Sequence, residues 1–136
     1  MALAAEIVGD RWTLLILREA FYGVSRYDDM RADLGAPRSM LSNRLARLVE
    51  HGLMTRRAYQ EPGDRERHAY VLTEAGRALA LTLVALTQWG ERWVISRPAP
   101  VKLVDRTTGK ALRVALVDKD GIEAAPENAR LVKRAR

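Results

Sequence analysis

One continuous segment, residues 38–67, constrains the fold most because its hydrophobic period changes within it. The sequence RSMLSNRLARLVE places three leucines on one helical stripe (Leu41, Leu45 and Leu48). His51 and Gly52 can end that helix. The segment LMTRRAY that follows has the two-residue period of a strand, and HAYVLT is predicted as a second strand. Between them, EPGD has the composition of a turn. We therefore predict a helix followed by a two-stranded hairpin.

A second helix is predicted immediately before this one. RYDDMRADLG is amphipathic, Ser25 is its expected cap, and Gly35 ends it. Pro37 stands where proline is tolerated, at or just before a helix start. Only residues 35–37 connect the two helices, and such a short connection containing glycine is typical of a helix-turn-helix. Further upstream, residues 2–8 and WTLLILREAFYG are expected to be helical, with Asp10 as the cap of the second.

The outer face of the helix beginning at residue 38 carries the candidate binding residues. At about 100° per residue, Ser39, Asn43 and Arg47 lie opposite the leucines. A solvated surface is the ordinary explanation of such a face, but the preceding helix and the following hairpin favour a recognition helix and a wing that contact DNA. Asn suits adenine and Arg suits guanine, so Asn43 and Arg47 are the expected base contacts.

The remaining candidate contacts are to the DNA backbone. Side chains at the helix start are expected to bind phosphate with help from the backbone N–H groups, and the wing is expected to lie on phosphate or in the minor groove. These residues are Arg38, Ser39, Ser42 and Arg44 on the helix, and Arg65 and Arg67 at the hairpin tip. Two acids at the same tip, Asp64 and Glu66, reduce its positive charge.

Residues 74–94 form the longest predicted helix, and it is apolar on two sides. Leu79, Leu83, Leu86 and Trp93 lie on one side, while Leu81, Val84 and Ala85 lie on the other. A core of this size can cover only one side, so the other is expected to meet a second protomer across a two-fold axis. The alternative is that the tail beyond residue 97 covers it.

The charge distribution changes near Arg97-Pro98-Ala99-Pro100. Residues 1–97 contain fourteen arginines, twelve acids and no lysine, whereas all four lysines follow. We expect one domain over residues 1–96 and an extension over residues 97–136, with strands near 101–105 and 112–117 and a basic, flexible end. That end, with Lys133, Arg134 and Arg136, either touches DNA phosphate or is simply solvated.

Composition excludes several classes of protein. The chain has 136 residues and a net charge of +6, which favours a polyanionic partner. It has no cysteine and two histidines, so we expect no disulfide, no metal site and no cofactor. No apolar run approaches the roughly 20 residues of a membrane span, and cytoplasm is the expected compartment. No catalytic motif is present, so an enzyme is the least favoured class.

Three ungapped blocks carry a resemblance to a known family. GDRWTLLILREAFYGVSRYDDMRADLG, LSNRLARLVEHGLMTRRAY and YVLTEAGRALALTLVALTQWGERW together resemble the HxlR-type winged helix-turn-helix transcriptional regulators. The resemblance implies a dimer built from the N-terminal helix and the long helix, which places Leu3 and Ile7 beside Leu81, Val84 and Ala85. Members usually carry a cysteine just before the position of Leu3, and this sequence begins too late to show it.

The expected fold is mainly α with a small β-hairpin (α+β). It is a winged helix-turn-helix with a long C-terminal dimerisation helix and a short β-containing tail. The expected function is a sequence-specific DNA-binding transcriptional regulator, a repressor, acting as a homodimer on a pseudo-palindromic operator of double-stranded DNA. A small-molecule effector near Trp12, Trp89 and Trp93 is one open hypothesis. The alternative function is a protein-interaction module that keeps the fold without binding DNA.

Overall fold

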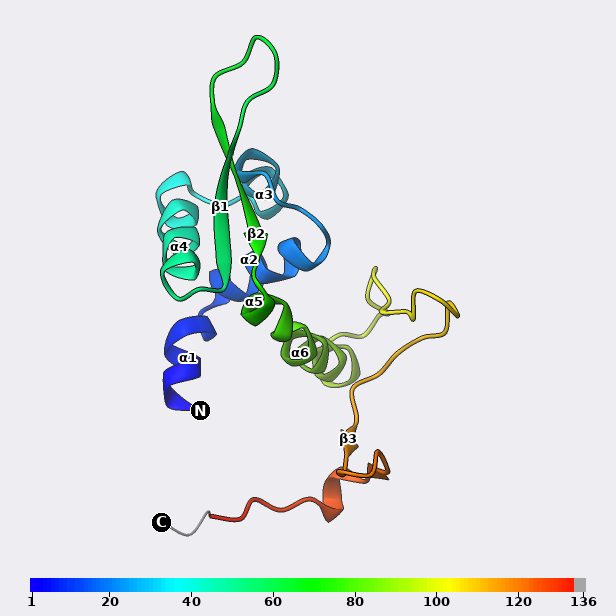
Figure 1. Cartoon of the computed structure of the whole chain (residues 1–136). Coiled ribbons are helices and arrows are strands. Elements are labelled where there is room, and N and C mark those ends of the chain that lie inside the picture. The colour runs from blue at the N-terminus through cyan, green and yellow to red at the C-terminus, as the bar shows by residue number, and fades with distance from the viewer. Residues whose placement is uncertain (134–136) are drawn as a thin grey trace. The chain divides into compact units, whose positions relative to one another are not determined.

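The computed structural model describes residues 1–133, which form two compact units, one of residues 1–83 and one from residue 84 onward. The first unit contains five helices, a β-hairpin and the beginning of a sixth helix (Figure 1). In chain order these are α1 (Ala2–Val8), α2 (Arg11–Phe21), α3 (Tyr27–Leu34), α4 (Arg38–Glu50), β1 (Met54–Tyr59), β2 (Arg67–Leu72), α5 (Glu74–Ala78) and α6 (Ala80–Trp93). The fold is therefore the predicted winged helix-turn-helix.

Local capping signals set several of the helix ends. The Asp10 carboxylate accepts the Thr13 backbone N–H and begins α2, as predicted. Gly35 ends α3 in the left-handed conformation at φ +59°, which glycine adopts without strain. The expected Ser25 cap is wrong: Arg26 holds the cap position of α3, and the Ser25 carbonyl instead accepts the Tyr70 N–H of the hairpin.

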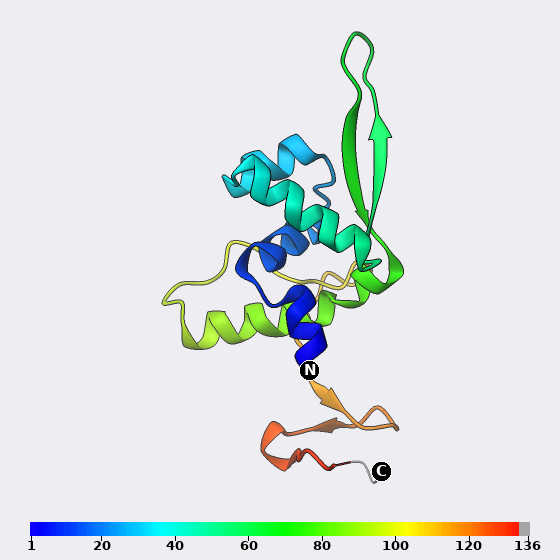
Figure 2. The same ribbon diagram turned by 90° about the vertical axis from the view of Figure 1, so that its left-hand side faces the viewer.

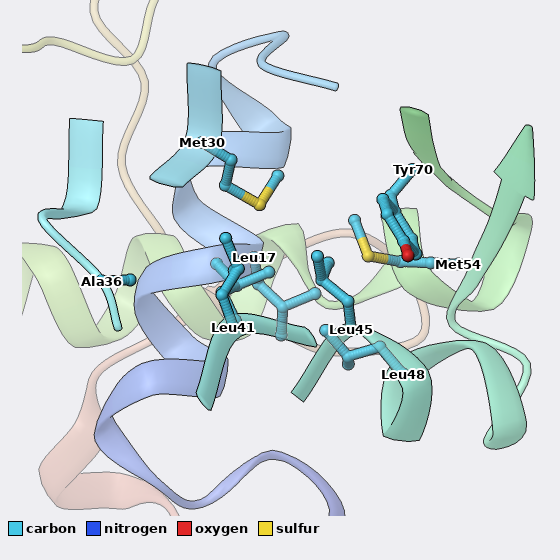
Figure 3. Close-up of a cluster of buried hydrophobic side chains, with 9 residues drawn as sticks. Leu17, Met30, Ala36, Leu41, Leu45, Leu48, Met54 and Tyr70 are labelled. Carbon is cyan, nitrogen blue, oxygen red and sulfur yellow. The ribbon is translucent and has the colours of Figure 1, made fainter. Parts of the chain in front are cut away.

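The hydrophobic core lies where α2, α3, α4 and the base of the hairpin meet. The predicted leucine stripe of α4 is fully buried, and its side chains point toward a common centre with Leu17 (Figure 3). Met30 comes from α3, while Met54 and Tyr70 come from the hairpin. The stripe fixes the rotation of α4 about its axis, which determines the side chains that α4 presents outward.

Strands β1 and β2 pair antiparallel, from Met54 opposite Leu72 to Tyr59 opposite Arg67. Only the base of this hairpin enters the core, because β1 is buried at Met54 and mostly exposed beyond it. Figures 1 and 2, seen from directions 90° apart, both show the outer half of the hairpin extending past the helices. Arg67, expected at the tip, is the first residue of β2.

The predicted single helix over residues 74–94 is interrupted at Leu79. The Leu79 N–H bonds to the carbonyl of Gly76, three residues back, and α6 begins one residue later. Leu79 and Leu83 pack against the core as expected. Leu86 and Trp93, expected on the same buried side, are exposed, and both lie beyond Leu83, the last residue of the first unit.

The residues from 84 onward form less β-structure than predicted. Between the expected strands over 101–105 and 112–117 there is one bridge, from Val104 to Ala111. The end of the second range is strand β3 (Leu116–Val117), which pairs with β4 (Glu123–Ala124). A short 3-10 helix, η1 (Pro126–Asn128), follows. The carboxylate of Asp105 accepts the N–H groups of Thr107 and Thr108, and such local bonds compete with a strand ladder.

This second unit is tied together by side chains. The Gln88 amide on α6 donates to the Leu112 carbonyl and accepts the Val114 N–H. Arg113 pairs with Glu123 at 2.5 Å. Of the terminal basic cluster, Lys133 is described, whereas Arg134 and Arg136 lie outside the described residues. The expected domain boundary after residue 96 stays a prediction.

Candidate nucleic-acid interface

Helix α4 presents a small, polar outer face. Ser39, Ser42, Asn43 and Ala46 are exposed on the side opposite the buried leucines. Pro37 precedes the helix and supplies no side-chain cap, so the N–H groups of the first turn point outward without a capping acceptor. Arg38 stands at this helix start. The combination of free N–H groups, a hydroxyl and an arginine suits an anion such as phosphate.

A groove of about 670 Å³ lies between this face and the hairpin. Its walls come from the start of α3, the outer face of α4 and both strands of the hairpin. Four arginines, one histidine and two acids line the groove, so basic residues predominate. The lining residues are Tyr27, Asp28, Arg38, Ser42, Ala46, Val49, Arg56, Arg65, Glu66, Arg67, His68 and Tyr70.

Tyr27 connects α3 to the first turns of α4. Its hydroxyl donates to the Arg38 carbonyl at 3.0 Å and lies 2.9 Å from the Ser42 hydroxyl. Because the tyrosine has one hydroxyl proton, the Ser42 O–H must be the donor of the second bond. Ser42, a predicted phosphate donor, therefore already uses its proton within the protein. The sequence predicted only an amphipathic helix around Tyr27 and not this contact with α4.

The two predicted arginines in the middle of α4 also have intramolecular partners. Arg44 pairs with Asp10 at 3.0 Å through Nε and donates to the Asn43 side-chain oxygen at 2.9 Å. Arg47 donates to the Glu6 backbone carbonyl at 3.1 Å. A guanidinium has five N–H donors, so both arginines keep donors for a further partner.

The surroundings of Asp10 lower the pKa of its carboxyl. Partial burial raises the pKa of this carboxyl, but the hydrogen bonds from Thr13 and Arg44 outweigh that effect and hold the pKa below its ordinary 3.8. Asp10 therefore stays ionised near neutral pH. It caps α2 and binds Arg44 of α4 at the same time, which joins α4 to α2.

The two predicted wing arginines differ in their surroundings. Arg65 is exposed in the loop and forms no ion pair with residues 1–133. Arg67 is half-buried and contacts Asp28 at 3.1 Å and Asp64 at 3.9 Å. Its Nε atom is buried and meets no acceptor in the described part of the chain. Of these two arginines, Arg65 is therefore the one that can reach outward.

Arg56 and His68 line the same groove and were not singled out from the sequence. An Arg56 guanidinium nitrogen lies 3.0 Å from the His68 Nε2. Strand alternation contains the signal that identifies them: Arg56 lies on the same side of β1 as the buried Met54, and that side faces α4.

The residues expected at a dimer interface lie on α1 and α6. Neither helix has a buried residue. Leu3 and Leu81 are 75% and 71% exposed, Ala85 is exposed, and Ile7 and Val84 are partly exposed. These apolar side chains are thus available to a second chain.

Two further observations concern the described residues as a whole. No three histidine, aspartate or glutamate side chains among residues 1–133 gather closely enough to hold a metal ion. No helix in that range combines the length and apolar character required to cross a membrane.

Comparison with known proteins gives consistent matches. The family model of HxlR-like helix-turn-helix proteins matches residues 7–98. Rv3095 of Mycobacterium tuberculosis, named an uncharacterized HTH-type transcriptional regulator, is 52% identical over 109 residues, which are 79% of this chain and 67% of that protein.

Two solved structures have similar folds over nearly the whole chain. PA1607, a candidate transcription factor, has a TM-score of 0.79 at 36% identity and covers 96% of this chain and 91% of its own. PA1374 of Pseudomonas aeruginosa, also described as a candidate transcription factor, has a TM-score of 0.69 at 33% identity, with 98% and 90% covered. The chain belongs to the HxlR-like helix-turn-helix family of DNA-binding transcriptional regulators.

Proposed function

We propose that this regulator acts as a homodimeric repressor that places the two copies of α4 in successive major grooves of a pseudo-palindromic operator. The observation that supports this most is the rotation of α4: burial of its leucine stripe leaves Ser39 and Asn43 exposed beside a basic groove. An α-helix fits the major groove, where base edges can be distinguished. A two-fold dimer spaces its half-sites by about one helical turn.

Asn43 and Arg47 are the proposed base contacts. The Asn43 amide keeps both N–H donors, since Arg44 occupies only its oxygen. Asn can pair with adenine and Arg with guanine through two hydrogen bonds each. For bidentate contact with guanine, Arg47 has N–H donors that the Glu6 carbonyl does not occupy. Loss of the Glu6 bond on DNA would cost one hydrogen bond within the protein.

Phosphate contacts are proposed at both ends of the groove. Arg38 and Ser39 stand beside the uncapped N–H groups of α4, and Arg65 extends from the wing loop. Arg44 can add a contact through the donors that Asp10 and Asn43 leave unused. These contacts position the protein on the duplex without distinguishing sequences.

The dimer is proposed to form through α1 and α6. Leu3 and Ile7 on α1 and Leu81, Val84 and Ala85 on α6 are its proposed contacts. Soluble monomers rarely expose large contiguous apolar patches, and these two helices have no buried residue in the isolated chain. Two copies related by a two-fold axis would cover both helices together.

Mutation of the base contacts tests this proposal. Arg47→Ala should cost roughly 1–3 kcal/mol and relax sequence preference, whereas Arg65→Ala should weaken all sequences about equally. Binding should also weaken steeply as salt rises, with a slope that reflects the number of phosphates contacted. A footprint on genomic DNA that survives Asn43→Ala and Arg47→Ala together would contradict the assignment.

The alternative is a protein-interaction module, which four acids near the presumed DNA face favour: Asp28, Asp29, Asp64 and Glu66. In the structure Asp28 and Asp64 both contact Arg67, so their charge is partly neutralised within the protein. This weakens the alternative. A partner protein whose binding is insensitive to salt, together with no retention on duplex DNA, would restore it.

We also propose that the protein responds to a small molecule. Trp89 and Trp93 on α6 are 57% and 68% exposed, and their fluorescence would report a ligand bound near them. Fluorescence that stays constant across a panel of metabolites would count against an effector at this helix.

A further inference from the structure

The outer half of the wing has no hydrophobic anchor. The wing comprises β1, β2 and the loop over residues 60–66. The core holds only its base, at Met54 and Tyr70, while the loop residues are all exposed. Both ribbon views show this outer half standing clear of the helices (Figures 1 and 2). Packing therefore does not determine the direction in which the wing tip points.

Two ion pairs of opposite polarity connect the outer half of the wing to the start of α3. Arg67 at the end of the loop contacts Asp28 at 3.1 Å. Arg26 contacts Glu61 at the beginning of the loop at 2.7 Å. One link thus has its cation on the wing, and the other has its cation on the body of the domain.

Contacts around Arg26 strengthen this connection. The Arg26 guanidinium lies 4.7 Å from the centre of the Tyr59 ring, within the range of a cation–π interaction. The Arg26 backbone forms a β-bridge with Ala69, and the neighbouring Ser25 carbonyl accepts the Tyr70 N–H at 2.7 Å. Residues 25 and 26 thereby act as a short third strand beside β2, and the ion pairs extend from it toward the loop.

We propose that Arg26, Asp28, Glu61 and Arg67 form a wing brace, a set of positioning residues that hold the wing at the angle required to contact DNA. This inference rests on the proposed DNA-binding function and assigns Arg67 a different role from Arg65. Arg67 acts on DNA through the direction of the wing, because its guanidinium already faces Asp28 and Asp64. Arg65 is the wing residue that contacts phosphate.

The brace affects binding more than stability. Half-exposed ion pairs add little to the stability of a fold, although several in a network order the chain they join. A wing that is ordered before binding avoids the entropy cost of ordering it on DNA. Loss of one link should weaken binding about two- to tenfold.

The direction in which one substitution changes DNA affinity distinguishes this proposal from an effect of charge alone. Asp28→Asn removes a negative charge beside a polyanion, so charge alone predicts tighter DNA binding. The brace predicts weaker binding, because Arg67 loses its partner. Glu61→Gln makes the same contrast at the second link. Asp29 and Glu66 form no ion pair with residues 1–133, so Asp29→Asn and Glu66→Gln are matched controls that should bind DNA slightly tighter.

Fluorescence anisotropy with a duplex selected by the full chain measures these affinities across a range of salt concentrations. The expected result is weaker binding for Asp28→Asn, Glu61→Gln and Arg67→Gln, with Asp28→Asn plus Arg67→Gln no weaker than either alone. Their thermal unfolding midpoints should stay within a few degrees of the unaltered chain. Tighter binding by Asp28→Asn would overturn the brace. The brace would also be overturned if Arg67→Gln lowered the slope of log affinity against log salt concentration by about 0.9 per protomer, because that change indicates a direct phosphate contact.

A measurement without DNA tests the wing brace separately from the proposed DNA-binding function. Backbone ¹⁵N relaxation should give order parameters near about 0.85 for the wing loop and lower values, toward about 0.6, in Asp28→Asn but not in Asp29→Asn. Equal order parameters in both variants would contradict the brace. If the unaltered chain binds no duplex, the proposed function fails, and the relaxation data still decide whether the brace exists.

Discussion

Gly76→Ala should destabilise the protein although it places a better helix former in α5. A Cβ at Gly76 would lie 2.1 Å from the Leu53 carbonyl oxygen and 3.1 Å from its carbon. That carbonyl is fixed because it accepts the Thr73 N–H at 3.0 Å. The Thr73 hydroxyl, in turn, caps α5 and donates to Gly52. Helix and turn must therefore separate to admit the methyl group.

The size of the effect follows from two opposing contributions. Replacing a helical glycine by alanine stabilises by up to about 1 kcal/mol. Overpacking against backbone costs about 1–3 kcal/mol, and weakening the Thr73–Leu53 hydrogen bond adds about 1 kcal/mol. We expect a net loss of roughly 1–3 kcal/mol. Gly90→Ala is the matched control, because Gly90 lies within α6 with nothing within 4 Å of its Cβ position, and it should stabilise by roughly 0.5–1 kcal/mol.

Urea unfolding followed by circular dichroism measures both variants. Protein concentration must be held constant, since dimerisation would link stability to concentration. The two substitutions should move the unfolding midpoint in opposite directions with similar m-values. A Gly76→Ala variant that is as stable as the original chain would refute the close approach of α5 to the turn after α4.

Three further predictions concern the core and the residues that contact α4. Leu45→Ala should cost about 2–5 kcal/mol in urea unfolding, because Leu45 is fully buried and its loss leaves a cavity. The pKa of Asp10 lies below 3.8 in the folded protein, so its carboxylate stabilises the fold above that pH, and the contribution is lost as pH falls through the folded pKa. Asp10→Asn keeps the helix cap, so its stability deficit should be constant near neutral pH and shrink in acid unfolding curves below pH 3.8. Tyr27→Phe removes the partner of the Ser42 hydroxyl and should cost about 0.5–1.5 kcal/mol in unfolding free energy while weakening DNA binding.

Helices set by local patterns could be predicted from the sequence. The spacing of Leu41, Leu45 and Leu48 identified α4 and its buried side, and Asp10 and Gly35 identified helix ends. These signals depend only on neighbours within about one helical turn. For the same reason, the outward face of α4 was predictable before its surroundings were known.

The partners of the site arginines could not be predicted in this way. Arg44 and Asp10 are separated by 34 residues, Arg67 and Asp28 by 39, and Arg47 and Glu6 by 41. No local pattern relates such pairs. The sequence therefore indicates which arginines are near the surface of α4 and the wing, but not which of them are already bonded.

The observed elements also differ from the predicted ones where individual hydrogen bonds compete with the regular pattern of a helix or a strand. At Leu79 the backbone N–H bonds to the Gly76 carbonyl three residues back, and the same Gly76 approaches the Leu53 carbonyl closely. Around Asp105 in the second unit, a carboxylate binds backbone N–H groups that a strand would otherwise use. Periodicity detects neither effect, because both depend on individual hydrogen bonds.

Selection of bound sequences from a random pool of duplex DNA tests the central claim most directly. A homodimer that reads DNA through α4 should enrich a symmetric site with two half-sites about one helical turn apart. In Asn43→Ala, preference should relax at one position in each half-site, while the spacing is retained. Failure to enrich any sequence, or enrichment of a single half-site without symmetry, would contradict the proposed dimeric DNA-reading mechanism.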